Sequence, residues 1–313
     1  MSFTKSLTPL HIICVLCLAL SSNCSPRNYR KNIWRREIKM AAQPQCGTFA
    51  SRRFVNFNGG IKFSQIKTIY SFGDSWTSNG RYDGSPPSPA VRQGTYPLYG
   101  RRASNGPMWT ENLASDQRTL KNYAIGGATV DHTLWKTRAM KSDMVGQVNK
   151  FLSQRLPIAS DSSLATIFYG INDYSAAAEG PGTLEQAANK LLTETERLID
   201  AGVKQFIVVS PYFNRASMNN FNNLVWNGFK AFKQSRGIKF AYVDLSALFT
   251  AIYANPSSFG YTSTGACLKS AMTTVGGCSD PDAYLYWIPS HPQYQTQRLE
   301  ADWVRAVLNK CQG

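Results

Sequence analysis

The segment IKTIYSFGDSW, residues 66–76, is the starting point for assigning a fold to this chain. Its apolar, β-branched half, residues 66–72, predicts a buried strand, which stops at Gly73-Asp74-Ser75-Trp76. A serine directly after a buried strand, at a turn that contains glycine, can present its hydroxyl above the sheet. The same turn is also typical of an ordinary helix N-cap, so the rest of the chain must decide.

Four further strand candidates follow, and helical patterns separate them. The strongest pattern covers residues 184–199, where apolar side chains recur on one stripe. Strands that alternate with helices indicate parallel βαβ units. We therefore expect an α/β fold, a three-layer α/β/α sandwich around a five-stranded parallel sheet. The remaining expected strands are 121–125, 164–169, 206–210 and 240–243, and the other helices are 144–156, 218–234 and 297–310.

Small or polar residues follow three of the five strands, where parallel sheets bind ligands. After the second strand, Gly127 permits a positive φ and leaves its N–H uncovered, which suits donation to an anion, although a tight βα turn would also explain it. After the third strand, in GIND, Asn172 could donate its side-chain amide to the same anion or cap a helix.

A serine hydrolase also needs an imidazole base, and the chain has three histidines, His11, His132 and His291. His11 lies in the N-terminal leader. His132 follows Gly127 by five residues and could line the cleft. His291 stands in an aromatic loop, YLYWIPSHP, before the final helix, and could return over the edge of the sheet. We therefore favour His291 as the base.

The N-terminal 60 residues differ from the rest of the chain. Residues 1–24 combine Lys5 with an apolar run at 10–20 and small residues, which predicts a signal peptide and a secreted protein; the run is short for the alternative, a membrane anchor. Residues 25–60 are interpreted as a basic pro-segment or extension, unless Met40 is the true start, and residues 61–313 as one domain. The chain holds 34 Lys and Arg against 19 Asp and Glu, but no basic block continues past residue 53, so nucleic acid is not an expected partner.

Five cysteines remain after residue 24, and secretion favours disulfides between them. Cys267 and Cys278 bracket a loop rich in Gly, Ser and Thr and form the best pair. Cys46 with Cys311 would tie the two ends of the domain together, and Cys24 would be left over. Because no Cys-x-x-Cys or His-x-x-His spacing follows residue 24, we expect no metal, and no cofactor is implied.

Taken together, these segments resemble the GDSL-type, or SGNH, lipase and esterase family over residues 66–309. GDS at 73–75, N-x-A-x-x-G at 122–127, G-x-N-D at 170–173 and a late His-Pro at 291–292 occur in the family's order. The GxSxG elbow of α/β-hydrolases is absent. YLYW before the histidine and the nearby cysteine pair resemble the fungal branch that includes acetyl esterases of carbohydrate esterase family sixteen. The resemblance implies an SGNH-hydrolase fold, which is flavodoxin-like.

The resemblance also implies roles for individual residues. Ser75 would be the nucleophile, and His291 would act first as general base and then as general acid. Three donors would form the oxyanion hole: the backbone N–H groups of Ser75 and Gly127 and the side-chain amide of Asn172. Acyl transfer needs these parts on physical grounds as well, namely a nucleophile, a base, and donors placed where negative charge develops.

The acids near these motifs do not supply the usual third member of a triad. Asp74 is interpreted as structural, with its carboxylate bonded to local backbone N–H groups, and Asp173 as a helix cap. The family pattern places aspartate three residues before the histidine, but here that position is Ile288. Replacing the acid of a comparable triad by an amide costs about 10⁴ in turnover.

Three explanations for Ile288 remain open. A backbone carbonyl, such as that of Ile288 itself, could accept the Nδ1 proton of His291 and leave a Ser-His dyad. Asp280 or Asp282 could supply a carboxylate from the preceding loop. Alternatively, the protein has lost catalysis and kept binding.

The expected substrate follows from the aromatic residues near the site. Trp76, His132 and Trp287 are candidates for lining a substrate cleft, because aromatic faces stack on sugar rings, although any single tryptophan more often packs in an ordinary core. We therefore expect a monomeric, secreted serine esterase for short acyl, mainly acetyl, esters of plant-wall carbohydrate or small esters. The alternatives are a lipase or phospholipase for longer acyl chains, and a non-catalytic carbohydrate-binding protein on the same scaffold.

Overall fold

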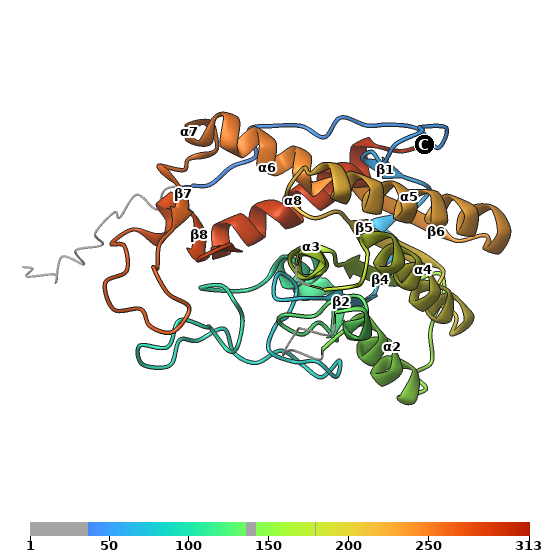
Figure 1. Ribbon diagram of the computed structural model, residues 1–313, viewed down its shortest axis with the longest axis horizontal. Coiled ribbons are helices and arrows are strands. Elements are labelled where there is room, and N and C mark those ends of the chain that lie inside the picture. Colours follow the sequence, from blue (N-terminus) through green and yellow to red (C-terminus); the bar gives the residue numbers. More distant parts are fainter. Residues whose placement is uncertain (1–36, 136–141, 179) are drawn as a thin grey trace, which may run out of the picture. The chain divides into compact units, whose positions relative to one another are not determined.

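The computed structural model describes residues 37–313 except 136–141 and 179 (Figure 1). Its centre is a six-stranded sheet in the order β1-β6-β5-β4-β2-β3. Five strands are parallel, and β1 pairs with β6 in the antiparallel direction. The strands are β1 (Phe57–Asn58), β2 (Thr68–Gly73), β3 (Thr119–Asn122), β4 (Ser163–Phe168), β5 (Gln205–Val209) and β6 (Lys239–Val243).

Helices cover both faces of this sheet (Figure 1). One core cluster joins the strands to α2, α4 and α5, and a second joins them to α1, α6 and α8. Successive strand residues alternate between the clusters: Ile167 belongs to the first and Phe168 to the second. The helices are α1 (Trp109–Ala114), α2 (Met144–Ser153), α3 (Ile171–Ala177), α4 (Leu184–Asp200), α5 (Ala216–Arg236), α6 (Leu245–Ala254), α7 (Pro256–Phe259) and α8 (Tyr294–Lys310).

The predicted three-layer sandwich is confirmed, with all five expected strands parallel and the four expected helices present. The sixth strand, β1, was missed because two residues are too few to show a period of two. Among the parallel strands, the second in the chain lies at the edge, followed in space by the first, third, fourth and fifth, which is the flavodoxin-like order. This order reverses between β2 and β4.

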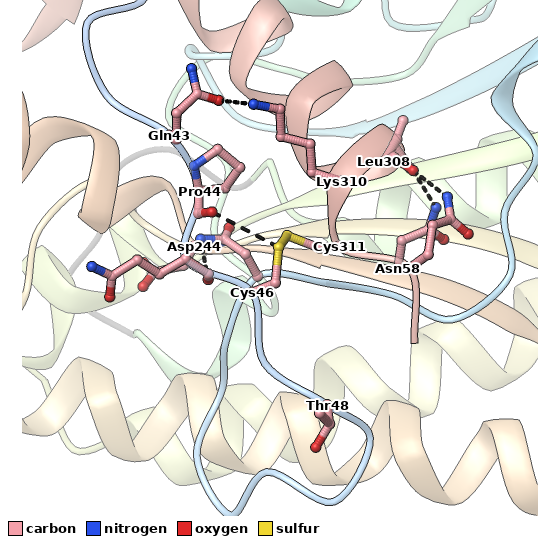
Figure 2. The surroundings of a disulfide bond; sticks show 12 residues. Gln43, Pro44, Cys46, Thr48, Asn58, Asp244, Leu308, Lys310 and Cys311 are labelled. Carbon is pink, nitrogen blue, oxygen red and sulfur yellow. Dashed lines mark hydrogen bonds between the residues drawn. A yellow bond between two sulfur atoms is a disulfide. The ribbon is translucent and has the colours of Figure 1, made fainter.

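The expected domain boundary at residue 61 needs correction, because residues 37–60 already belong to the folded unit. Ile38 is buried in the core, and β1 extends the sheet. The Cys46–Cys311 disulfide joins this segment to the end of α8, and the Asn58 amide donates to Leu308 O at 2.7 Å (Figure 2). The expected signal peptide, which includes Cys24, and residues 25–36 of the basic segment lie outside the described residues.

A small second sheet carries the C-terminal motif. It consists of β7 (Ser263–Ala266), β8 (Tyr284–Ile288) and β9 (His291–Pro292) in that order. The predicted Cys267–Cys278 disulfide is present, so both expected disulfides are confirmed. Four short 3₁₀ turns complete the description: Phe63–Gln65, Ser115–Gln117, His132–Leu134 and Pro281–Ala283. Within the described residues, no helix is both long enough and apolar enough to cross a bilayer.

Candidate active site

The candidate site lies beyond the carboxyl ends of β2 and β4, where the strand order reverses. The register pairs Gly73 with Phe168, so the turn with Ser75 and the start of α3 with Asn172 emerge side by side. Only glycine fits at the end of β2, because a Cβ on Gly73 would lie 2.9 Å from Phe168 O and 2.8 Å from Thr77 Oγ1. Sheet topology therefore brings together two motifs that are about 100 residues apart.

Ser75 and His291 are in hydrogen-bond contact. The distance from Ser75 Oγ to His291 Nε2 is 2.8 Å, and both residues are half-buried. β9 delivers His291 by pairing it with Ile288 of β8. On the other side of the ring, Nδ1 faces Pro289 O at 2.9 Å, which suits the tautomer that carries its proton on Nδ1. The geometry can thus transfer a proton between the hydroxyl and Nε2.

Of the three explanations for Ile288, this contact matches the first, in which a backbone carbonyl faces Nδ1, but the carbonyl is that of Pro289 rather than Ile288. The Ile288 side chain packs into an apolar cluster with Trp287 and the Cys267–Cys278 disulfide. Burial lowers the pKa of His291, and the hydrogen bond with Pro289 partly opposes the shift. A lowered pKa keeps the imidazole neutral, the form that can accept a proton.

Two uncovered backbone N–H groups lie near the serine. Gly127 has φ +78°, a conformation that favours glycine, and a Cβ on neighbouring Gly126 would lie 3.8 Å from Ser75 Cβ. Within residues 37–313, apart from the undescribed gaps, no acceptor is bonded to the backbone N–H of Ser75 or Gly127. These groups are therefore able to donate to an anion.

The Asn172 side chain lies at the same place, but it already has partners. Its Nδ2 donates to Asp74 Oδ2 at 3.1 Å and to Ala128 O at 3.0 Å. The Asp74 carboxylate thus holds the amide, and it also accepts the Trp76 N–H at 2.9 Å, as expected for a structural residue. Burial raises the pKa of Asp74 to about 7, with a smaller contribution from Asp173.

Asp173 is not a helix cap, which corrects the prediction. Gly170 is the N-cap of α3, and no side chain caps that helix. Asp173 is buried and accepts hydrogen bonds from Val130 N–H and Trp135 Nε1, both at 3.0 Å. It therefore holds the segment that follows Gly127, a tertiary role that local sequence patterns do not reveal.

Gln147 of α2 is a site residue that sequence reasoning missed. Its amide pairs with both sides of Gly73: Gly73 N–H donates to Oε1 at 3.1 Å, and Nε2 donates to Gly73 O at 2.9 Å. The Tyr169 hydroxyl adds a third bond to Oε1 at 2.5 Å. The only signal was a glutamine on the apolar stripe formed by Met144, Val148 and Phe151.

The expected aromatic cleft is not formed. Trp76 and Trp287 are 1% and 5% exposed, so neither indole face is available to stack on a sugar. The Trp287 indole donates to Pro97 O at 2.8 Å. His132 is partly exposed, but its Nδ1 lies 2.5 Å from Asp143 Oδ2 rather than against Ser75. The two tryptophans failed as predictions because proximity in sequence says nothing about which way a side chain points.

A three-layer α/β sandwich with a serine, a histidine and free N–H donors at the switch point defines a serine hydrolase scaffold without the GxSxG elbow. A profile of the family described as GDSL-like Lipase/Acylhydrolase matches residues 69–304, three-quarters of the chain. The protein belongs to this family, whose members hydrolyse acyl esters. No curated protein matches the sequence.

Solved structures with low sequence identity also match. A lipolytic protein of the G-D-S-L family from Veillonella parvula is 17% identical (TM-score 0.42), and the match covers 78% of this chain and 100% of that one. The psychrotrophic esterase EstA from Pseudoalteromonas is 14% identical (TM-score 0.41; 78% and 97% covered). A family two carbohydrate esterase from Cellvibrio japonicus is 14% identical (TM-score 0.31; 56% and 51% covered).

Proposed function

We propose that the protein is a secreted serine esterase that removes short acyl groups, mainly acetyl, from plant-wall carbohydrate, and that it belongs to the fungal branch of the family. A Ser75–His291 dyad carries out the chemistry. The observation that carries the proposal is the 2.8 Å contact between Ser75 Oγ and His291 Nε2, with Nδ1 bonded to Pro289 O. Because this carbonyl can fix the tautomer, the dyad can work although Ile288 replaces the acid.

In the reaction, His291 Nε2 takes the proton of Ser75 as Oγ attacks the ester carbonyl, which forms a tetrahedral intermediate. The imidazolium then gives this proton to the departing alcohol, and an acyl-serine remains. Water attacks the acyl-serine with His291 again as the base, which releases the acid and restores Ser75. Pro289 O holds the Nδ1 proton throughout and carries no charge, so it stabilises the imidazolium less than a carboxylate would.

The negative charge of the tetrahedral intermediate develops on the carbonyl oxygen, where three hydrogen-bond donors can stabilise it. The backbone N–H groups of Ser75 and Gly127 are uncovered and need no rearrangement. Asn172 contributes by sharing the amide N–H that faces Ala128 O, while the bond to Asp74 keeps its side chain in place. The oxyanion hole is therefore two fixed backbone donors plus one side-chain donor that Asp74 orients.

Hydrolysis of longer acyl esters is the second candidate, and a specific surface favours it. Two loops, residues 86–102 and 267–278, are joined by the Thr274 N–H to Thr95 O bond of 2.8 Å. Four of the large apolar side chains exposed on the described residues lie on these loops, and so could contact an acyl chain or a lipid. They are Val91, Tyr96, Met272 and Val275.

A chain-length series separates the candidates. Rates on p-nitrophenyl esters from acetate to palmitate, and acetate release from acetylated xylan, are measured for the wild type and Ser75→Ala. The proposal predicts the highest kcat/KM on acetate, acetate release from xylan, and loss of both in Ser75→Ala. A maximum of kcat/KM on long-chain esters would favour the second candidate. Equal background rates in the wild type and Ser75→Ala would favour the remaining alternative, a non-catalytic carbohydrate-binding protein.

A further inference from the structure

The turn that carries His291 has to fix the imidazole by its own geometry. The acceptor for Nδ1 is Pro289 O, two residues away in the same turn, so ring and acceptor move together when the turn moves. Ser290 between them has φ +60°, in the left-handed region that residues other than glycine rarely adopt. Contacts from outside the turn are therefore needed to hold it.

One such contact comes from the residue that follows the nucleophile. The Trp76 indole Nε1 donates to Ser290 O at 3.1 Å. This oxygen belongs to the peptide that leads into His291, so the bond fixes the plane from which the imidazole projects. The backbone N–H of Trp76 donates to Asp74 Oδ1 at 2.9 Å. One residue thus sets the position of both members of the dyad, since Ser75 is bonded to it directly.

The indole is itself held rigidly. Its ring stacks on Tyr212, with centroids 4.4 Å apart and planes at 11°, and it packs against Phe249 and Phe168 at 5.5 and 6.0 Å. Tyr212 also faces the turn: burial raises the pKa of its phenol, and the Ser290 side chain opposes that shift. The indole that holds the Ser290 carbonyl is therefore itself fixed by its aromatic neighbours.

We propose that Trp76 is a positioning residue for His291, which takes over the orienting part of the role that the triad acid has elsewhere. This inference rests on the proposed Ser75–His291 dyad. Trp76 touches no reacting atom; it acts through the Ser290 carbonyl and keeps Nε2 within reach of Ser75 Oγ. The carboxylate's other contribution, charge stabilisation of the imidazolium, is not replaced.

Trp76→Phe tests the proposal, because it keeps a packed ring and removes the indole N–H. The expected result is a roughly 10-fold or greater fall in kcat with KM within about twofold, since a small misplacement of a reacting group is costly. The acid limb of kcat/KM should also move to lower pH, because a loosened Nδ1 bond to Pro289 O supports the imidazolium less. A purely structural role would not move this limb.

Trp226→Phe is the matched control. Trp226 is fully buried in α5, and its Nε1 donates to a backbone carbonyl, Ser51 O, at the same distance of 3.1 Å. It should lower stability while leaving kcat and the acid limb unchanged. An equal fall of kcat in both variants, or kcat of Trp76→Phe within twofold of wild type, would overturn the proposal.

A titration by NMR tests the same claim without catalysis. Histidine-labelled Trp76→Phe should show a lower pKa for His291 than the wild type, whereas Trp226→Phe should not. The result stands even if hydrolysis proves independent of Ser75, so failure of the proposed function is distinguishable. If Trp76→Phe does not fold, Tyr212→Phe keeps the stacked ring and removes the hydroxyl facing Ser290. It should shift the pKa in the same direction, and an unchanged titration would overturn the proposal that contacts with Ser290 position His291.

Discussion

Replacing Gln147 by leucine should damage both stability and activity, and the size of each effect follows from three bonds. The substitution removes bonds of 3.1 and 2.9 Å with Gly73 and of 2.5 Å with Tyr169, all in a buried site. The Gly73 N–H, the Gly73 carbonyl and the Tyr169 hydroxyl would remain buried without partners. At about 1–3 kcal/mol each, partly relieved by relaxation, the loss is about 3–6 kcal/mol of unfolding free energy.

The activity of Gln147→Leu should fall as well, because the Gly73 peptide sets the turn that presents Ser75. A displaced nucleophile predicts a loss of about 10²-fold in kcat. Urea unfolding followed by tryptophan fluorescence measures stability, and p-nitrophenyl acetate measures kcat under conditions where the variant is folded.

Gln205→Leu provides the control for this prediction. Gln205 is also buried and donates to Ser160 O and Asp161 O, but at the opposite end of β5, away from the serine. It should lose stability with an unchanged kcat. Loss of stability in Gln147→Leu without loss of kcat would refute the link between this glutamine and the turn.

Three further predictions concern titration and the chain ends. Because burial lowers the pKa of His291, the acid limb of kcat/KM should have its midpoint below 6.5, and a midpoint above 7 would contradict this. The pKa of Asp74 is raised to about 7, so its stabilising contribution is complete below about pH 4 and is lost as pH rises through 7. Asp74→Asn should remove a decline of about 4 kcal/mol across that window in urea unfolding, and an unchanged pH profile would contradict the assignment. It should also lower kcat, because the new amide has a single acceptor oxygen and cannot accept from both the Trp76 N–H and the Asn172 amide. The double variant Cys46→Ser, Cys311→Ser opens a long loop, and it should lower the free energy of unfolding by about 5 kcal/mol with little change in kcat. A loss of less than about 1 kcal/mol would show that other contacts hold the segment.

The sequence was sufficient for the layers and the parallel sheet, because strands and helices buried on predictable faces leave clear periodicities. It was insufficient for β1, whose two residues owe their conformation to pairing with β6 and to the Cys46–Cys311 disulfide. For the same reason, the predicted start of the domain, residue 61, lies too far along the chain. Contacts between distant segments, and not local preference, place residues 37–60 in the fold.

For the site, motif order was enough to predict that Ser75 and His291 meet, although Ser75 follows a strand of the parallel sheet and His291 comes from the small second sheet. It could not tell which carbonyl faces Nδ1, because that depends on the left-handed Ser290. It also gave Trp76 as a candidate for lining a substrate cleft, whereas the indole is buried and donates a hydrogen bond to the turn. The direction in which a side chain points is a tertiary property, so motifs locate such residues without giving their contacts.

The central claim is that Ser75 acts as a nucleophile with His291 and no carboxylate. The most direct measurement is hydrolysis of p-nitrophenyl acetate by the wild type beside Ser75→Ala, both purified in the same way. The account predicts turnover by the wild type that falls to background in Ser75→Ala. Equal rates in the two proteins, near background, would contradict it.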